Sequence, residues 1–118
     1  MKDYGFVHDA SELRAMIAKN PDLPIVVLAG EEANVGDYYW MYCSDVRCCI
    51  DYILDVETPY DDECVFTEIC EFEDKVRNYL YNDATKKLSD DEYDAMVKAE
   101  VAKYEPYWKK VIAVYVTN

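Results

Sequence analysis

Two uninterrupted apolar runs constrain the fold of this 118-residue chain more than any other feature. Residues 25–29 read Ile-Val-Val-Leu-Ala, and residues 111–116 read Val-Ile-Ala-Val-Tyr-Val. Successive side chains of a strand point to opposite sides of its sheet, so a run that is apolar throughout is typical of a strand covered on both faces. We therefore expect two central strands, drawn from opposite ends of the chain, that lie next to each other.

Two segments in the middle of the chain also favour extended structure. Residues 38–43 are rich in aromatic side chains, and residues 46–55 alternate between apolar and mostly polar positions. A Ser-Asp pair typical of a turn separates them, so together they predict an antiparallel hairpin. Residues 64–66 are a candidate for one further short strand.

A short helix is predicted near the N-terminus, over residues 10–19, from apolar side chains that recur at three and four residues. Pro21 disfavours helical geometry in the residue before it, so the helix should end at Asn20. Asp9 and Glu12 have the spacing of a variant capping box, with the Asp9 carboxylate accepting from the Glu12 N–H.

Two more helices are predicted in the second half of the chain. Residues 68–80 carry apolar side chains at helical spacing, and the next helix begins after Ser89, which forms a capping box with Glu92. We expect Asp94 and Lys98, four residues apart, to pair on the solvent side. The element order is then α-β-β-β-(β)-α-α-β, which predicts a single α+β domain over residues 1–118, with a mainly antiparallel sheet and about three helices packed on it.

The net charge of −13 restricts the classes of molecule that the chain can bind. Nucleic acid and anionic membrane surfaces carry the same sign of charge and should be repelled, so a partner should be a basic protein. The sequence contains no apolar run long enough to cross a bilayer, and its first ten residues lack the apolar core of a signal peptide. We therefore expect a cytoplasmic protein. The five cysteines are an odd number, which favours free thiols.

An acidic stretch stands out within this charge, since residues 48–74 hold ten Asp and Glu and no Lys or Arg. Some of these acids have structural uses, on the polar face of a strand or in the first turns of a helix where the macrodipole favours negative charge. The others surround a Pro-Tyr turn that no structural rule requires to be acidic. They are the candidate partner-binding residues: Glu57, Tyr60, Asp61, Asp62, Glu63 and Glu68. The alternative is that they only solvate the surface.

Catalytic, cofactor and metal motifs are missing from the sequence, so we predict no enzyme and no cofactor. There is no Gly-rich phosphate loop, and the acidic runs lack the alternating ligands and central Gly of a calcium loop. The cysteine spacings Cys43-x4-Cys48 and Cys64-x5-Cys70 do not match structural zinc sites, which favours small buried residues instead. Nothing in the sequence places His8, the only histidine, beside a thiol.

Residues 20–26 and 108–116, together with Tyr39-Trp40-Met41 and the acidic middle, resemble small acidic proteins encoded by phages and prophages of Gram-positive bacteria. That family brings no established activity, and the cysteine-rich residues 43–49 are not a feature of it. The resemblance implies a phage context, in which small acidic proteins serve as inhibitors of host enzymes, including defence nucleases.

Two functional hypotheses follow from charge and resemblance. The first is a non-enzymatic protein that imitates the phosphate array of a nucleic acid and blocks a basic host protein, such as a CRISPR effector. The second is a small structural or self-associating domain whose acids only keep it in solution. A homodimer would then bury the stripe formed by Tyr38, Trp40 and Tyr42, which we otherwise expect in the core or under a helix. A thiol or metal function is a third, weaker alternative.

Overall fold

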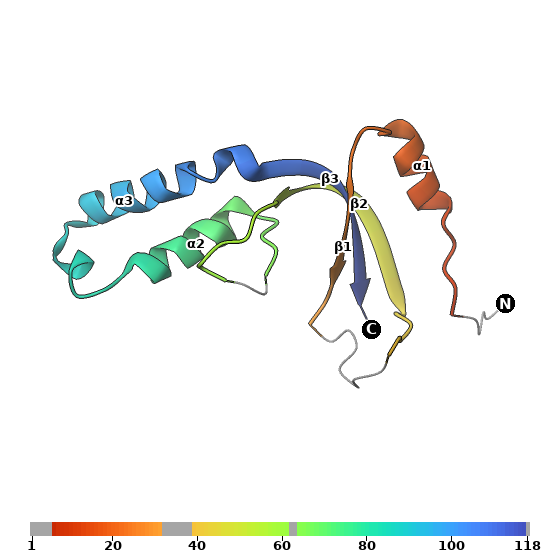
Figure 1. The fold of residues 1–118 in the computed structure, drawn as a ribbon, viewed down its shortest axis with the longest axis horizontal. Coiled ribbons are helices and arrows are strands. Elements are labelled where there is room, and N and C mark those ends of the chain that lie inside the picture. The colour runs from red at the N-terminus through yellow and green to blue at the C-terminus, as the bar shows by residue number, and fades with distance from the viewer. Residues whose placement is uncertain (1–5, 32–38, 62–63, 118) are drawn as a thin grey trace. The chain divides into compact units, whose positions relative to one another are not determined.

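The computed structural model describes residues 6–31, 39–61 and 64–117, and it has the predicted α+β class (Figure 1). Three helices and a three-stranded mixed sheet follow one another in the order α-β-β-α-α-β. Two short 3-10 turns, Thr85–Lys87 and Glu105–Tyr107, lie between them. The main elements are α1 (Ser11–Lys19), β1 (Ile25–Ala29), β2 (Asp45–Leu54), α2 (Ile69–Leu80), α3 (Asp90–Ala102) and β3 (Trp108–Thr117).

The two apolar runs lie next to each other in the sheet, as predicted. The strand order is β1-β3-β2, and β1 runs parallel to β3 with Ile25 opposite Ile112 and Ala29 opposite Val116. Only β3 is central, because β1 and β2 flank it. The prediction that β1 is also central is therefore wrong. The prediction that both of its faces are covered is wrong too, because Ile25 and Val27 remain exposed.

The predicted hairpin does not form. Of residues 38–43, Tyr38 lies outside the described residues, and residues 39–43 have no regular structure. The neighbour of β2 is instead β3, from the far end of the chain, and among the described residues no strand lies on the other side of β2. Trp40 is 93% exposed and Tyr42 is also exposed, so neither is core. Residues 64–66 are not a strand either.

Helix ends follow the local sequence at two of the three helices. The Ser89 hydroxyl accepts from the Glu92 N–H, and the Glu92 carboxylate accepts from the Ser89 N–H, so the predicted capping box is confirmed. α2 begins at Ile69, within one residue of the prediction. The cap predicted for α1 is wrong, because the Asp9 carboxylate accepts from the N–H and hydroxyl of Ser11 instead of from Glu12.

The chain divides into two compact units, and β2 and β3 each contribute residues to both. We call Met1–Asp51 with Lys110–Asn118 the sheet unit, and Tyr52–Lys109 the helical unit. The helical unit has a core of five fully or almost fully buried side chains: Leu54, Phe66, Phe72, Val76 and Val97. In the sheet unit burial is concentrated in β3, where Ile112 and Ala113 are inaccessible to solvent. None of the described helices is long and apolar enough to cross a membrane.

Candidate functional site

Glu57 and Glu68, two of the predicted contact residues, present their carboxylates to solvent. Glu57 lies in the loop after β2, and Glu68 is the residue before the first turn of α2. Both are exposed, and within the described part of the chain neither carboxylate has a hydrogen-bond or ion-pair partner. They are therefore open to contact with another molecule.

Tyr60 differs from these two glutamates, because the structure packs its ring into the helical unit. Its ring lies edge-on to Phe72, Tyr79 and Tyr104, with centroid distances of 5.7, 5.0 and 5.9 Å. Its hydroxyl donates to the Glu100 carboxylate at 2.8 Å. Burial, and then the bond to Glu100, raise the pKa of Tyr60. The ring thus ties the loop after β2 to α2 and to the end of α3.

Asp61 also has partners inside the unit. One of its carboxylate oxygens accepts from the Cys64 N–H at 3.2 Å, and the other lies 3.5 Å from the Lys75 ammonium. The first bond links Asp61 to Cys64, a few residues before α2. The other two predicted contact residues, Asp62 and Glu63, lie outside the described residues.

An acidic ridge follows one side of α2 and extends the predicted surface. Phe72 and Val76 turn toward the core and are fully buried. Glu68, Glu71 and Asp74 succeed one another at three-residue spacing, which keeps them along one side of a helix, and all three are exposed. None of the three has an ion-pair partner among the residues that the structure describes. We call Glu68, Glu71 and Asp74 the acidic ridge.

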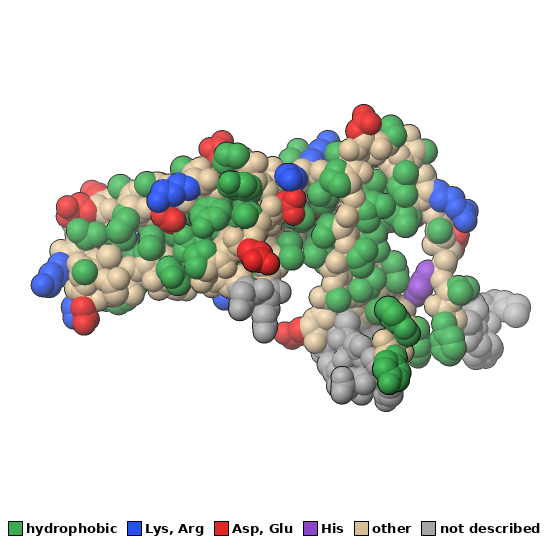
Figure 2. All heavy atoms as spheres, in the orientation of Figure 1, with side chains coloured by type: hydrophobic (Ala, Val, Ile, Leu, Met, Phe, Trp, Pro, Cys, Tyr) green, Lys and Arg blue, Asp and Glu red, His purple; other side chains and the backbone are tan. Residues whose placement is uncertain are grey.

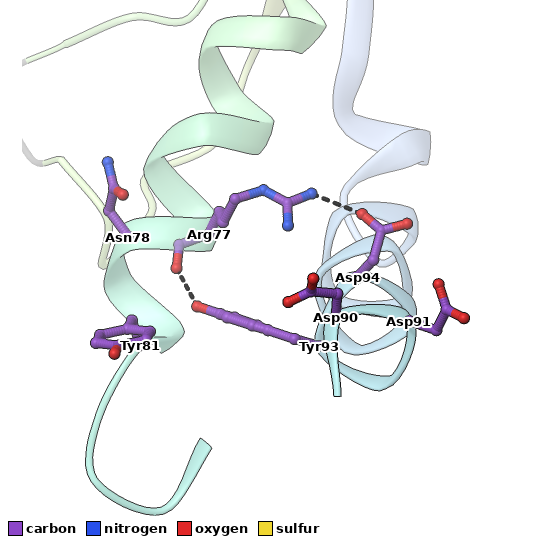
Figure 3. Close-up of a pocket in the computed structure, with 7 residues that line it drawn as sticks. All are labelled: Arg77, Asn78, Tyr81, Asp90, Asp91, Tyr93 and Asp94. Atoms are coloured by element: carbon purple, nitrogen blue, oxygen red, sulfur yellow. Dashed lines mark hydrogen bonds and ion pairs between the residues drawn. The ribbon is translucent and has the colours of Figure 1, made fainter. Parts of the chain in front are cut away.

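A pocket of about 460 Å³ lies between the C-terminal half of α2 and the start of α3 (Figure 3). Seven residues line it: Arg77, Asn78, Tyr81, Asp90, Asp91, Tyr93 and Asp94. The packing of α2 against α3 brings these residues together. The capping box at Ser89 sets where α3 begins, and so places Asp90 and Asp91 in its first turn.

Arg77 neutralises one side of this pocket. Its guanidinium donates to Asp94 at 2.7 Å and to Glu73 at 3.3 Å, and it lies 6.0 Å from the centroid of the Tyr93 ring. The guanidinium lowers the pKa of the Asp94 carboxyl, to which Lys98 also contributes. Lys98 lies 3.0 Å from Asp94, so the predicted pair is confirmed. Within this group the charges are largely balanced.

The other side of the pocket keeps an unbalanced negative charge next to aromatic rings. The Tyr81 and Tyr93 rings are stacked, with centroids 6.2 Å apart and planes at 19°, and the Tyr93 hydroxyl donates to the Arg77 carbonyl. Figure 3 shows Asp90 on the side of α3 that carries Tyr93, with Asp91 pointing away. Neither carboxylate is paired within the described residues. A carboxylate beside two phenol rings suits an incoming ammonium or guanidinium group.

A second pocket, of about 240 Å³, lies in the sheet unit under α1 and contains His8 and Cys48. His8 is hydrogen-bonded to the Cys43 carbonyl at 2.7 Å through its ring. Burial, together with the nearby Glu12 carboxylate, raises the pKa of the Cys48 thiol. A nucleophilic cysteine needs a lowered pKa, so this neighbourhood disfavours catalysis by Cys48.

All five cysteines are free thiols, and they differ in exposure. Cys43, Cys48 and Cys64 are partly buried, whereas Cys49 and Cys70 are exposed. The prediction that the cysteines are small buried residues is therefore wrong for Cys49 and Cys70. Within the described ranges, no three His, Cys, Asp or Glu side chains come together in a way that would hold a metal ion.

The sequence indicated the acids of this surface more readily than its pocket. Glu71 and Asp74 had a structural explanation in the helix macrodipole, although their three-residue spacing with Glu68 is visible in the sequence. The pocket residues Tyr81 and Asp90 could not be associated, because their proximity depends on how α2 and α3 pack. Comparisons with protein-family models, curated proteins and solved structures find no match for this chain.

Proposed function

We propose that this chain is a non-enzymatic binding protein, from a phage context, that docks its acidic helical unit on a basic nucleic-acid-handling protein of the host. Docking would block that protein, as an inhibitor of a CRISPR effector does. The charge of the helical unit carries the proposal, since it has sixteen Asp and Glu against seven Lys and Arg. Seven of these acids are exposed and unpaired within the described residues: Glu57, Glu68, Glu71, Asp74, Asp90, Asp91 and Glu105.

The spacing of the acidic ridge supports imitation of a phosphate backbone. Three residues of an α-helix rise about 4.5 Å along the axis, so Glu71 and Asp74 succeed one another at an axial spacing about a third longer than the roughly 3.4 Å between phosphates on one DNA strand. A basic groove built for phosphates would attract such a row, and its bound counterions would be released on docking. The ridge would thus steer and orient the partner.

The pocket between α2 and α3 adds a place for one side chain of the partner. Arg77 already balances Glu73 and Asp94, which leaves Asp90 with the rings of Tyr81 and Tyr93. A lysine or arginine of the partner would gain an ion pair to Asp90 and contact with the phenol faces. Such a contact would fix the position of the partner on the helical unit, which long-range attraction between charges alone does not do.

Affinity capture of host proteins, with duplex DNA added as competitor, tests the proposal. We expect the captured protein to be basic, to be displaced by DNA, and to lose its own activity on nucleic acid when the chain is bound. Affinity should fall by about tenfold or more when salt rises from about 0.05 to about 0.3 M, because contacts between exposed charges are screened. Inhibition that is unchanged at high salt would rule out the phosphate-mimic mechanism.

A pair of matched variants locates the surface. Glu71→Lys with Asp74→Lys reverses two charges on the acidic ridge, and Asp83→Lys with Glu105→Lys makes the same change in net charge at exposed positions off α2. We expect the ridge variant to weaken binding about tenfold more than the control, mainly through slower association. Equal losses from both variants would show that net charge, not the ridge, matters.

Self-association is a second candidate function, favoured by the exposure of Trp40 at 93% beside exposed Tyr42. Aromatic side chains this open are typical of contact surfaces. Sedimentation velocity of the wild-type chain and of Trp40→Ser would decide, because a functional dimer through this segment should dissociate on substitution. A monomer at all concentrations would eliminate this candidate.

A further inference from the structure

The outer edge of β1 has a row of backbone groups that no strand of the described residues pairs with. The Pro24 carbonyl accepts from the Ile112 N–H at 2.9 Å, and the Gly30 N–H donates to the Val116 carbonyl at 2.9 Å, so the even-numbered residues of β1 face β3. Backbone groups alternate in direction along a strand, which points the N–H and C=O groups of Ile25, Val27 and Ala29 the other way. No strand among the described residues meets them.

β1 is short and follows Pro24 directly, but within its own residues it lacks other features that protect an edge strand. Natural edges carry charges, prolines or bulges that prevent pairing with another chain. The other edge of this sheet, β2, contains Asp45, Arg47 and Asp51. β1 contains no charge and no proline, and its register with β3 is unbroken over all five residues.

Exposed apolar side chains accompany this edge. Ile25 is 49% exposed and Val27 is 62% exposed. The register places both on the same face of the sheet as Ile112 and Val114, which are buried. Figure 2 shows hydrophobic side chains over much of the visible surface of the sheet unit. A strand added at the edge would extend this apolar row and shield Ile25 and Val27 from water.

Charge at the two ends of β1 indicates which strand would fit. Exposed Asp22 precedes the strand, and exposed Glu31 follows it directly after Gly30. Antiparallel pairing of two copies about Val27 would bring Asp22 of each copy near the Glu31 end of the other, where like charges repel. A strand with cationic ends would be attracted at both ends instead.

We infer that the β1 edge binds an extended segment of a basic partner polypeptide, with lysine or arginine at both ends of an uncharged β-prone stretch. The segment adds to the sheet as a fourth strand through the outward N–H and C=O groups of Ile25, Val27 and Ala29. The inference takes the basic character of the partner from the proposed function, but it concerns a different surface. Main-chain hydrogen bonds to β1 hold the segment, and Asp22 and Glu31 favour a segment whose ends are positively charged.

A synthetic peptide with a Val-Thr-Val-Thr-Val core and two lysines at each end is the probe. Titration into the full-length ¹⁵N-labelled chain should shift the amide signals of β1 and slow hydrogen exchange at Ile25, Val27 and Ala29. The amides of Val26 and Leu28 already face β3 and should change little. A peptide with the same core and glutamates at its ends should bind at least tenfold more weakly, since it meets Asp22 and Glu31 with like charge.

Two variants at one position separate strand addition from unspecific attraction. Val27→Pro removes the outward N–H at the centre of the edge, where proline is tolerated because that N–H makes no bond to β3. Val27→Thr keeps the N–H and the β-branched shape. We expect roughly a tenfold loss of peptide affinity for Val27→Pro and less than about threefold for Val27→Thr.

Equal binding of the lysine and glutamate peptides, equal affinity of the two variants, or no protection of the three outward amides would overturn the inference. Failure to bind the lysine peptide at millimolar concentration would do the same. The proposed function is tested separately, by the Glu71 and Asp74 substitutions on α2. Loss of one set of effects without the other therefore shows which of the two proposals is wrong.

Discussion

The two units differ in where their buried hydrophobic residues come from. In the helical unit, Phe66 and Phe72 are almost completely buried, and Tyr60, Tyr104 and Trp108 pack around them. In the sheet unit, α1 has no buried residue, and large apolar side chains remain exposed from Phe6 through Val27 to Trp40. The helical unit therefore has a core built from its helices and loops, whereas in the sheet unit the buried side chains are those of β3 and α1 stays largely exposed.

Charge is distributed in the opposite sense. The helical unit has a net charge of −9, from sixteen acids and seven bases, and the sheet unit has −4, from nine acids and five bases. Acids are thus most numerous where apolar side chains are best covered. In our two proposals, the helical unit attracts a partner at long range through its charge, and β1 of the sheet unit makes short-range backbone contact. A partner that uses both would be steered by the first and held by the second.

Truncating one aromatic side chain in each unit tests this difference in packing most directly. Phe72→Ala removes a fully buried ring that lies 5.1 Å from Phe66 and 5.2 Å from Tyr104, so the free energy of unfolding should fall by about 3–5 kcal/mol. Trp40→Ala removes a larger but exposed ring and should change it by less than about 0.5 kcal/mol. Urea denaturation followed by far-UV circular dichroism measures both. A cost of several kcal/mol for Trp40→Ala would show that the aromatic segment is packed in solution.

A smaller effect on stability is expected at the N-terminal ends of α3 and α1, which are capped differently. α3 has a complete capping box, whereas the residue that caps α1 is Ala10, which makes no side-chain bond. Ser89→Ala should therefore lower the free energy of unfolding by about 1 kcal/mol, while Ser89→Thr should retain most of the stability. Ser11→Ala in α1 should change it by less than about 0.5 kcal/mol. Equal losses from Ser89→Thr and Ser89→Ala would mean that the hydroxyl is not the stabilising group.

Local rules predicted much of the fold because they depend on neighbours in the sequence. The capping box at Ser89, the break at Pro21 and the helical spacing of α2 each involve residues within one or two turns. The pairing of β1 with β3 was also accessible, since two fully apolar runs in a small domain have few other places to lie. The pattern could not show which run lies at the edge, because strand order depends on where β2 enters the sheet.

The aromatic segment illustrates where such reasoning ends. Residues 39–43 have strand propensity, but propensity depends strongly on context, and the strand that pairs with β2 is β3 instead. The same limit applies to the candidate site. Glu57 and Glu68 are exposed as expected, whereas the engagement of Tyr60 with Glu100 joins residues forty positions apart in sequence. The spacing of residues in the sequence does not predict such a contact.

The smallest expected effect concerns the balanced charges beside the pocket, and it is visible as a dependence on pH. Arg77, with help from Lys98, lowers the pKa of Asp94 below its ordinary value. A carboxyl whose folded-state pKa is depressed stabilises the fold above its unfolded pKa, and that contribution is lost as the pH falls through the folded value. Stability of the wild-type chain should therefore drop between about pH 5 and about pH 2, and Asp94→Asn should make this drop shallower.

Asp91→Asn, on the same turn but without an ion-pair partner in the described part of the chain, serves as the control. Urea midpoints measured across this range decide the matter, and an equal change of slope in both variants would mean that Arg77 does not single out Asp94. Because the side chains of Arg77 and Asp94 are both 39% exposed, the difference should shrink further in high salt.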